Sequence, residues 1–531
     1  MSLGESFINV FDPTGGRSDD ELLGTALSAI GAEPRPCTFW ISRVATVGGT
    51  VTFPPSVTLS FAPGARLVVL KRLTLQGFLD AGLEARFEVR GDGIVELLGP
   101  LEEIVADWWV PSQGLSPVEH ALRALWSRYA HAGEGVLPAP IRLDGPYELS
   151  RTLRVLPPAE LTGRVDVVLR GQHGRSLDPP TFVMVPVPTA TMPWSMLSIE
   201  AGVVLTMENV AFDADPGPAN AHARSCVSLE GTFHGSRIEA CSFRFGIAGV
   251  LVSPRVQQQR EAAAAAGGTS ESVARNLLED AIELSTTSTN RLEVSRCLFT
   301  GVSLPAGAFD GARGIDIGLG APTALTLRDS QFVGAFANGV AIIGGELDVT
   351  ACQFANETAR PFFHGSAAAT ADVLVRRWGD DAEAYDLRLA PKDWPIPRPD
   401  SRKDVANVDR GIPLANTHAT ITHCVSTSPV FLVMFQAFSY SGTILGGAVL
   451  TNVRHSPSSA ARWNSVVLGP GMPPRALILQ GCRFGDSVLL DATGPADVVV
   501  DLGTRINARP AYTLGTAVGP AGVITLRSPG A

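Results

Sequence analysis

Five charged residues have the types and spacing that acid–base chemistry on a sugar chain requires. Asp213 and Asp215 are two positions apart, so an extended chain places both side chains on one face. Three more charged residues follow close together, and these are Asp310, Arg313 and Asp316. Two carboxylates about 5 to 9.5 Å apart can hydrolyse a glycosidic bond. In the alternative interpretation, the aspartates form turns or face solvent, and Arg313 is a surface residue.

The same residues would support β-elimination only with a bound metal. A lyase of this kind needs Ca²⁺ held by carboxylates and a base such as Arg313. No group of three acidic residues recurs at a regular spacing, and His418 and His423 are five positions apart, on opposite faces of a strand. We therefore expect no metal site and no cofactor. Ca²⁺ would be a cofactor only if the chain is a lyase.

A second group of residues has the types that bind a partner without reacting. Arg376, Trp378, Tyr385 and Trp394 lie in one Pro-rich and charge-rich segment. Aromatic rings offer flat apolar faces to sugar rings, and arginine adds hydrogen-bond donors. Because long loops on a rigid scaffold often carry binding residues, we predict a glycan- or protein-binding surface here. In the alternative interpretation, the tryptophans fix the loop to the wall of the scaffold.

A repeated phrase, apolar-x-apolar-x-x-Cys-x-Phe, indicates which scaffold carries these residues. Clear copies end at Phe299, Phe354 and Phe484, and looser ones end at Phe212, Phe243 and Phe332 or surround Cys424. The final phenylalanines are 31 residues apart from Phe212 to Phe243, 33 from Phe299 to Phe332, and 22 from Phe332 to Phe354. Repeats of this length are typical of solenoids, whose units bury their apolar faces against one another.

The phrase predicts a strand, a bend and a second strand in each repeat. Alternating apolar residues form a half-buried strand, and the two residues that break the alternation form the bend. In a parallel β-solenoid each inward position repeats one layer higher, so Cys would stack on Cys and Phe on Phe. We interpret the cysteines as buried core residues, since free Cys is among the most buried residue types. A thiol or metal site is the functional alternative.

The front half of the chain resembles the pectate-lyase superfamily of right-handed parallel β-helix proteins, which includes tailspike-like chains. The matching features are Trp108-Trp109, the helix predicted from Pro117, Gly145-Pro146-Tyr147 and Leu169-Arg170-Gly171. The segment VPSQGLSP after Trp109 departs from the family, which has an Asp-rich loop there. The resemblance implies the fold, whereas activity stays open, because this architecture hosts lyases, hydrolases, epimerases and inert spikes.

We therefore predict an all-β chain, a right-handed parallel β-helix with an N-terminal cap that bears helices. The cap and short strands would occupy 1–110, a helix and the first layers 111–200, and the main β-helix 201–531. Two insertions would interrupt it, a helical one at 254–287 and a loop at 358–413. Two further helices are predicted from periodicity, at 19–30 and 117–131.

Composition narrows the classes of function. The 531 residues have a formal net charge of −10, which disfavours nucleic-acid binding. No basic and apolar leader opens the sequence, and no apolar run is long enough for a membrane helix, so we expect cytoplasmic synthesis with the final location unknown. Seven cysteines without a CxxC pair argue against a metal cluster.

The function predicted from these features is a non-catalytic interaction scaffold, spike-like or fibre-like, which presents loops to a glycan or protein partner. The alternative is a carbohydrate-active enzyme, a polysaccharide lyase or glycoside hydrolase, that acts on an acidic polysaccharide. The sequence leaves enzymatic activity undecided, and a homotrimer is possible because many parallel β-helices trimerise.

Overall fold

The computed structural model is built almost entirely of parallel strands. The structure describes residues 6–11, 17–30, 36–112, 114–172, 181–185, 195–200, 202–214, 225–230, 235–245, 248–253, 290–302, 313–317, 323–336, 338–343, 345–356, 371–376, 417–428, 431–436, 447–456, 466–468, 477–484, 490–492, 496–506, 509–510, 516–519 and 522–527. The chain divides into two compact units, residues 1–147 with 157–173 and residues 148–156 with 174–531. Each unit is a coil of short strands, and the boundary falls within β13 (Tyr147–Leu149).

Unit 1 contains three small parallel sheets. Their orders are β1-β2-β5-β8, β3-β6-β9 and β10-β7-β4. The strands are β1 (Ser6–Asn9), β2 (Cys37–Ile41), β3 (Val44–Val47), β4 (Val51–Phe53), β5 (Val57–Phe61), β6 (Arg66–Val69), β7 (Arg72–Leu75), β8 (Phe78–Asp80), β9 (Phe87–Val89) and β10 (Ile94–Leu97). Further along the unit, β11 (Ile104–Val105), β12 (Ile141–Leu143) and β15 (Val165–Gly171) pair in parallel.

Both helices predicted in the front half are present in unit 1. Helix α1 (Asp19–Ala29) begins at Ser18 and α2 (Pro117–Ala130) at Ser116, and each serine closes a capping box with a glutamate three residues later. Short 3₁₀ turns, η1 (Ala106–Trp108) and η2 (Ala132–Glu134), lie on either side of α2 in the chain.

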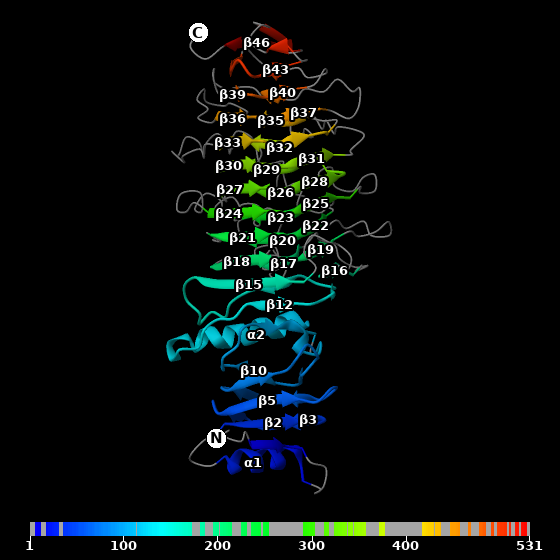
Figure 1. Ribbon diagram of the computed structural model, residues 1–531, viewed down its shortest axis with the longest axis vertical. Coiled ribbons are helices and arrows are strands. Elements are labelled where there is room, and N and C mark those ends of the chain that lie inside the picture. Colours follow the sequence, from blue (N-terminus) through cyan, green and yellow to red (C-terminus); the bar gives the residue numbers. More distant parts are fainter. Residues whose placement is uncertain are drawn as a thin grey trace, which may run out of the picture. The chain divides into compact units, whose positions relative to one another are not determined.

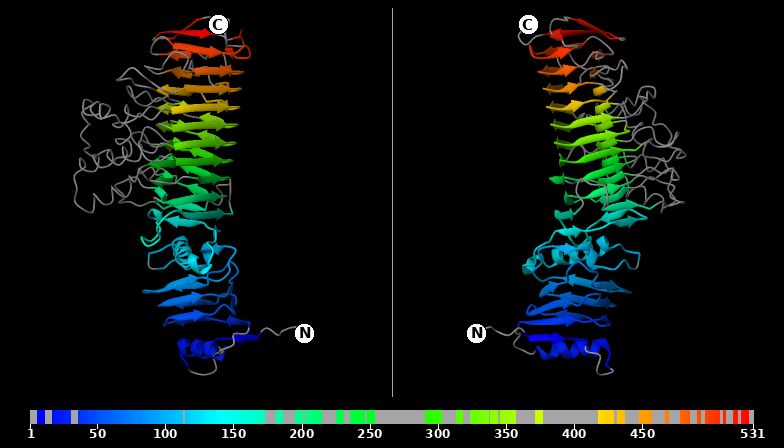
Figure 2. Two further views of the ribbon diagram at one scale, coloured as in Figure 1. Left: turned by 90° about the vertical axis from the view of Figure 1, so that its left-hand side faces the viewer. Right: turned by 45° about the vertical axis from the view of Figure 1, so that its right-hand side comes forward.

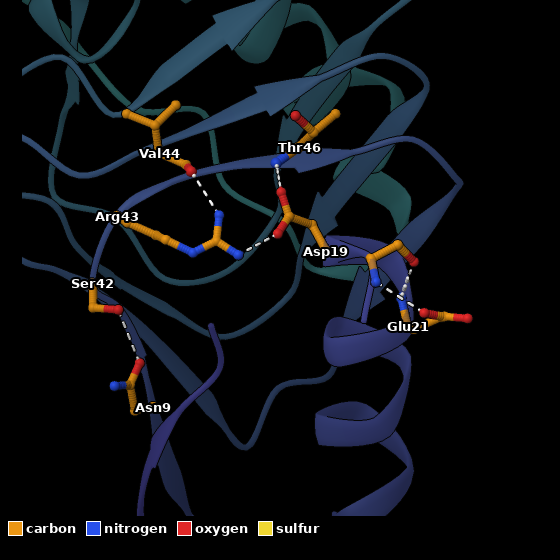
Figure 3. A network of polar contacts seen from close by, with 8 residues as sticks. Asn9, Asp19, Glu21, Ser42, Arg43, Val44 and Thr46 are labelled. Atoms are coloured by element: carbon orange, nitrogen blue, oxygen red, sulfur yellow. Dashed lines mark hydrogen bonds and ion pairs between the residues drawn. The ribbon is translucent and has the colours of Figure 1, made fainter. Parts of the chain in front are cut away.

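Helix α1 is anchored to the first coil of unit 1 by its first acidic residue (Figure 3). The Asp19 carboxylate forms an ion pair with Arg43 and accepts a hydrogen bond of 2.7 Å from the backbone nitrogen of Thr46 in β3. Ser42 donates to the side-chain oxygen of Asn9, which ties β1 to the turn after β2. The helix thus covers the end of the coil, as predicted for the cap (Figure 2).

Unit 2 repeats three strands in each coil, and equivalent strands of successive coils pair in register (Figure 1). The first sheet contains β18 (Val203–Glu208), β21 (Ser236–Glu239), β24 (Asn290–Ser295), β27 (Thr323–Arg328), β30 (Gly345–Thr350), β33 (Thr417–Thr422), β36 (Gly447–Thr451), β39 (Leu477–Gln480), β42 (Ala496–Val500), β46 (Gly522–Arg527) and β45 (Thr516–Gly519). Only β45 pairs antiparallel in this sheet among the described strands.

The second and third sheets complete each coil of unit 2. The second contains β16 (Phe182–Met184), β19 (Ala211–Asp213), β22 (Ser242–Phe245), β25 (Leu298–Gly301), β28 (Gln331–Gly334), β31 (Gln353–Asn356), β34 (Val425–Ser426), β37 (Arg454–His455), β40 (Arg483–Phe484), β43 (Arg505–Ile506) and the antiparallel β44 (Arg509–Pro510). The third contains β14 (Leu153–Val155), β17 (Ser195–Ile199), β20 (Ser225–Glu230), β23 (Ala248–Ser253), β26 (Arg313–Ile317), β29 (Asn338–Ile343), β32 (Ala371–Arg376), β35 (Phe431–Gln436), β38 (Val466–Leu468) and β41 (Leu490–Ala492).

The predicted stacking of phenylalanines is confirmed. Rings of Phe182, Phe212, Phe243, Phe299, Phe332 and Phe354 form one column inside the second sheet. Neighbouring ring centroids are 4.6 Å apart for Phe299 and Phe332 and 4.9 Å apart for Phe332 and Phe354, with nearly parallel planes. The inward positions therefore repeat layer by layer, and the chain is a right-handed parallel β-helix.

The predicted bend between the first and second strands of the coil is a single left-handed residue. Positive φ angles occur at Asn209, Ala240, Arg296, Asp329, Ala351, His423, Asn452 and Gly481. The backbone nitrogen of each bend residue from Asn209 to Asn452 donates to a carbonyl of the next coil, as Arg296 does to Arg328 at 3.0 Å. Only one of these residues is glycine, so pairing between coils holds a conformation that L residues rarely adopt.

The two predicted insertions differ in what the structure describes. All of 254–287 lies outside the described residues, and so does the helix predicted within it. Inside 358–413 the structure has β32, which pairs with β29 and β35. The prediction that this whole segment is a loop over the scaffold was therefore wrong for 371–376, because these residues complete a coil.

Candidate functional site

The predicted catalytic residues lie on different sheets where they are described. Asp213 ends β19 of the second sheet, whereas Arg313 and Asp316 belong to β26 of the third sheet, two coils later. In register, Arg313 lies beside Ala248 and Asn338, and Asp316 beside Leu251 and Ala341. Asp215 and Asp310 lie outside the described residues. The described backbone does not place Asp213 on the strand that carries Arg313 and Asp316.

Asp213 is engaged in an ion pair. One of its carboxylate oxygens lies 3.4 Å from a guanidinium nitrogen of Arg244, which occupies the same register position on β22. Behind this pair, the Cys226 thiol donates to the backbone oxygen of Arg244. Burial raises the pKa of Cys226, and the nearby Asp213 charge raises it further. The contact with Arg244 gives this carboxylate a structural partner.

The predicted binding residues are described only in part. Arg376 ends β32, in register with Ile343 and Gln436. Trp378, Tyr385 and Trp394 lie outside the described residues. The glycan- or protein-binding surface assigned to this segment therefore stays a prediction.

The cysteines belong to the core. All seven are free and buried, and five occupy the inward position directly after the bend: Cys241, Cys297, Cys352, Cys424 and Cys482. Each of these thiols donates to the carbonyl two residues before it, as Cys297 does to Ser295 at 3.2 Å. The thiol of Cys424 and burial both raise the pKa of Cys352. Their burial and their place in the repeat confirm the interpretation of these cysteines as core residues.

The described residues include no group of three His, Cys, Asp or Glu side chains placed to hold a metal ion. Within the same described part of the chain, no helix has both the length and the apolar character needed to cross a membrane.

A buried polar group interrupts the phenylalanine column, and sequence reasoning missed it. Ser426 and His455 occupy the positions after Phe354, before Phe484 continues the column. His455 Nε2 lies 3.0 Å from the carbonyl oxygen of Ser428, and burial lowers the pKa of the imidazole. The signal was present, since AVLTNVRH has the spacing of the repeat with Val at the Cys position and His at the Phe position.

The outer surface of the first sheet carries charges that neutralise one another. Glu239 forms ion pairs with Arg237 on its own strand and with Arg296 at the bend of the next coil. One coil further, Arg328 lies 3.7 Å from Asp348 of the neighbouring strand. On this face, these three arginines therefore lie beside carboxylates.

The outer surface of the second sheet carries a different arrangement at its C-terminal end. Arg454, Arg483 and Arg505 occupy one register position on three successive strands, β37, β40 and β43. We call these three residues the arginine ladder. Arg454 and Arg483 are exposed and Arg505 is half-buried. The same column continues backwards through exposed Val425, Gln353 and Gln331. The separations in sequence are irregular, so only the register reveals the ladder.

Comparison with known proteins returns weak structural likenesses. No protein-family model matches the chain, and no curated protein matches it. Two structures of the surface adhesin PfbA of Streptococcus pneumoniae share 9% identity with it, each aligned over 97% of this chain. They cover 88% and 94% of the adhesin chains, with TM-scores of 0.28 and 0.24. The A-module of a mannuronan C-5 epimerase from Azotobacter vinelandii shares 8% identity over 97% of this chain and 96% of its own, with a TM-score of 0.14.

These values carry no conclusion about what this chain binds or does. The fold rests on its own strand pairing, which defines a parallel β-helix protein. Membership of the pectate-lyase superfamily stays a prediction.

Proposed function

We propose that this protein is a non-catalytic interaction scaffold whose outer surface binds a glycan or protein partner. The observation that carries the proposal is the exact repetition of outward positions along unit 2, where register places equivalent side chains of successive coils side by side. Neighbouring strands are about 4.8 Å apart, so such columns offer an extended partner contacts at regular intervals.

The interior supports this role by holding the outer columns rigid. Phenylalanine rings and buried thiols fill the inside of most described coils, and the backbone of the bend is hydrogen-bonded from coil to coil. A surface that is already ordered loses little conformational entropy when a partner binds. A stiff, periodic wall therefore favours binding to a long or repeating partner.

The competing class is a carbohydrate-active enzyme that acts on an acidic polysaccharide. It would use Arg313 and Asp316 on β26, with Asp213 or residues outside the described part of the chain. The ion pair between Asp213 and Arg244 favours a structural role for that carboxylate.

The test is to measure binding and turnover on the same panel of polysaccharides and proteins. Array binding reports partners, while reducing ends and the absorbance of unsaturated products report hydrolysis and elimination. We expect saturable binding without turnover. Robust turnover that is lost in Asp316→Ala would replace the scaffold by an enzyme. Light scattering on the same samples tests the possible homotrimer.

A further inference from the structure

The arginine ladder places three like charges in line without a described counter-charge. The register pairs Arg454 with Arg483 and Arg483 with Arg505. Among the described residues, no carboxylate forms an ion pair with any of the three. Arg505 instead donates to the carbonyl oxygens of Leu502 and Thr504, at 2.7 and 3.3 Å.

The described carboxylate next to the ladder already has other partners. One oxygen of Asp501 accepts hydrogen bonds from the backbone nitrogens of Gly481 and Thr504 and from the Thr504 hydroxyl, at 2.9, 2.8 and 2.6 Å. This carboxylate closes the bend of the last coils rather than neutralising an arginine. Within the described part of the chain, no carboxylate therefore pairs with the ladder.

Like charges directly opposite each other on neighbouring strands are destabilising. On the first sheet, Arg328 pairs with Asp348 and Arg237 with Glu239, although Glu208 lies opposite Glu239 in register. The ladder has no such described pair for any of its three arginines, although the chain as a whole has a net charge of −10. A repeated local excess of cations on an acidic protein points to an anionic ligand that relieves the repulsion.

We propose that the arginine ladder binds a linear sulfated glycan, and this rests on the interaction-scaffold function proposed above. Three guanidinium groups in one line, about 4.8 Å apart, suit a polymer that carries anions at regular intervals. A guanidinium donates two parallel hydrogen bonds to an oxyanion. A sulfate ester has three terminal oxygens, so one group can accept from two neighbouring arginines, whereas a carboxylate has two oxygens.

The neighbouring positions of the same column suit the sugar part of such a polymer. Val425, which is 41% exposed, offers an apolar contact beside Arg454. Exposed Gln353 and Gln331 follow in register and carry amides, which both donate to and accept from hydroxyl groups. The column thus passes from cations to neutral hydrogen-bonding groups along the direction of the polymer.

A single-stranded nucleic acid fits this column less well. Proteins that bind such strands combine a basic groove with aromatic side chains on which the bases stack. Here the aromatic residue next to the ladder, Phe484, faces inward and is 3% exposed. No aromatic side chain occupies the described outward column from Gln331 to Arg505.

The experiment compares the full-length protein with a triple variant, Arg454→Ala, Arg483→Ala and Arg505→Ala. The matched control, Arg237→Ala, Arg291→Ala and Arg328→Ala, removes the same charge from the first sheet of the same unit. The probe is a size-defined heparin oligosaccharide, and its affinity is measured by calorimetry at several salt concentrations. Melting curves of each variant establish that it is folded.

We expect the ladder variant to bind heparin at least tenfold more weakly, whereas the control binds as the unaltered protein does. The dependence of affinity on salt should fall by about one unit of slope or more, because several charge contacts are removed. Replacing the three arginines by lysine should keep the salt dependence but weaken binding, since lysine lacks the fork of donors. At low salt and without ligand, Arg483→Ala should melt no lower than the unaltered protein.

Three results would overturn the ladder proposal. These are equal heparin binding by the ladder variant, equal loss in the control, or tighter binding of oligo-dT or of an unsulfated uronate polymer than of heparin. None of these results contradicts the proposed scaffold function if the protein still binds a partner on the array without turnover. Turnover of any panel substrate would instead remove the scaffold function, whatever the ladder binds.

Discussion

The inner column of the second sheet is filled in two ways along unit 2. From Phe182 to Phe354 it is a continuous stack of rings, each fully buried or nearly so. In the next two described coils, Ser426 and His455 take the same position, both with no exposed surface. The backbone register is unchanged between the two parts, so one architecture accepts either filling.

The difference shows what each filling depends on. Stacked rings gain from dispersion and apolar burial and need no partner of a particular type. The polar filling depends on directed bonds, because a buried polar group without a partner destabilises the fold. Ser428 supplies the carbonyl for His455, and its hydroxyl accepts a hydrogen bond of 3.0 Å from the backbone nitrogen of Asn356. The aromatic part should therefore respond to changes of size, and the polar part to pH.

The largest effect is expected from opening the aromatic column. Phe299→Ala removes a ring that contacts Phe243 and Phe332, with centroids 4.8 and 4.6 Å away. The loss in free energy of unfolding should be about 3–5 kcal/mol, measured by hydrogen exchange of β25 and its neighbours. Phe299→Leu, which leaves a smaller cavity, should cost clearly less. Equal exchange rates in both variants would show that the stack does not hold the coil.

A smaller loss is expected from crowding the same column from the third sheet. A Cβ atom at Gly314 would lie 2.5 Å from Phe332 Cε1 and 2.5 Å from the carbonyl oxygen of Gly339. Gly314→Ala should cost about 1–3 kcal/mol, because the ring and backbone must shift. Gly24→Ala is the matched control, since it meets nothing within 4 Å in α1 and should be neutral or stabilising. A melting temperature unchanged by Gly314→Ala would contradict the close approach.

The polar part should make stability depend on pH. Burial lowers the pKa of His455 below its ordinary value of 6.5, so the native state holds a neutral ring while the unfolded chain takes up a proton. Its stabilising effect is complete above pH 6.5 and is lost as pH falls below that value. Urea unfolding should give a lower free energy of unfolding at pH 5 than at pH 7.5. In His455→Phe, this difference between the two pH values should be smaller.

A histidine of unit 1 also makes the free energy of unfolding depend on pH, and its contribution must be separated from that of His455. Burial lowers the pKa of His120 to about 4, and its Nε2 lies 3.1 Å from the Ser112 hydroxyl. Its contribution is therefore lost between pH 6.5 and about 4 by the same linkage. Because His120 is present in both proteins, only the difference between His455→Phe and the unaltered chain reports on the second sheet. An identical pH dependence would contradict the role of His455.

The smallest effect is expected outside the column altogether. Arg328 and Asp348 lie on the outer surface of the coils that contain Phe332 and Phe354, with side chains 58% and 42% exposed. A double-mutant cycle with Arg328→Ala and Asp348→Ala should give a coupling below about 1 kcal/mol, which 1 M salt reduces further. A coupling of several kcal/mol would show that the outer face, and not the inner column, holds these coils.

The sequence predicted the fold because the residues of the inner columns recur at fixed positions of the repeated phrase. Cys and Phe at a regular offset identified the first two strands of the coil and the bend between them. The third strand has no such signature, so the sequence predicts a loop where the structure has β32. The repeated phrase also does not identify the coil with His455, because this coil has neither Cys nor Phe where the phrase requires them.

The arginine ladder could not be found in the same way. Its members are separated by 29 residues from Arg454 to Arg483 and by 22 from Arg483 to Arg505. Segments of variable length between the strands hide the repeat, and register alone aligns the three side chains. The catalytic residues predicted from sequence stay a prediction, because Asp215 and Asp310 lie outside the described residues.

The left-handed bends form a row of equivalent positions along unit 2, one in each coil. Eight successive positions, filled by Asn, Ala, Arg, Asp, Ala, His, Asn and Gly, share one backbone conformation, and none of them is buried. Since side chains this diverse are already accommodated, foreign groups such as dyes, metal-binding histidines or reactive thiols could be mounted there at single-strand steps. The labelled protein would then carry chosen groups at regular spacings, and its interior would stay the same.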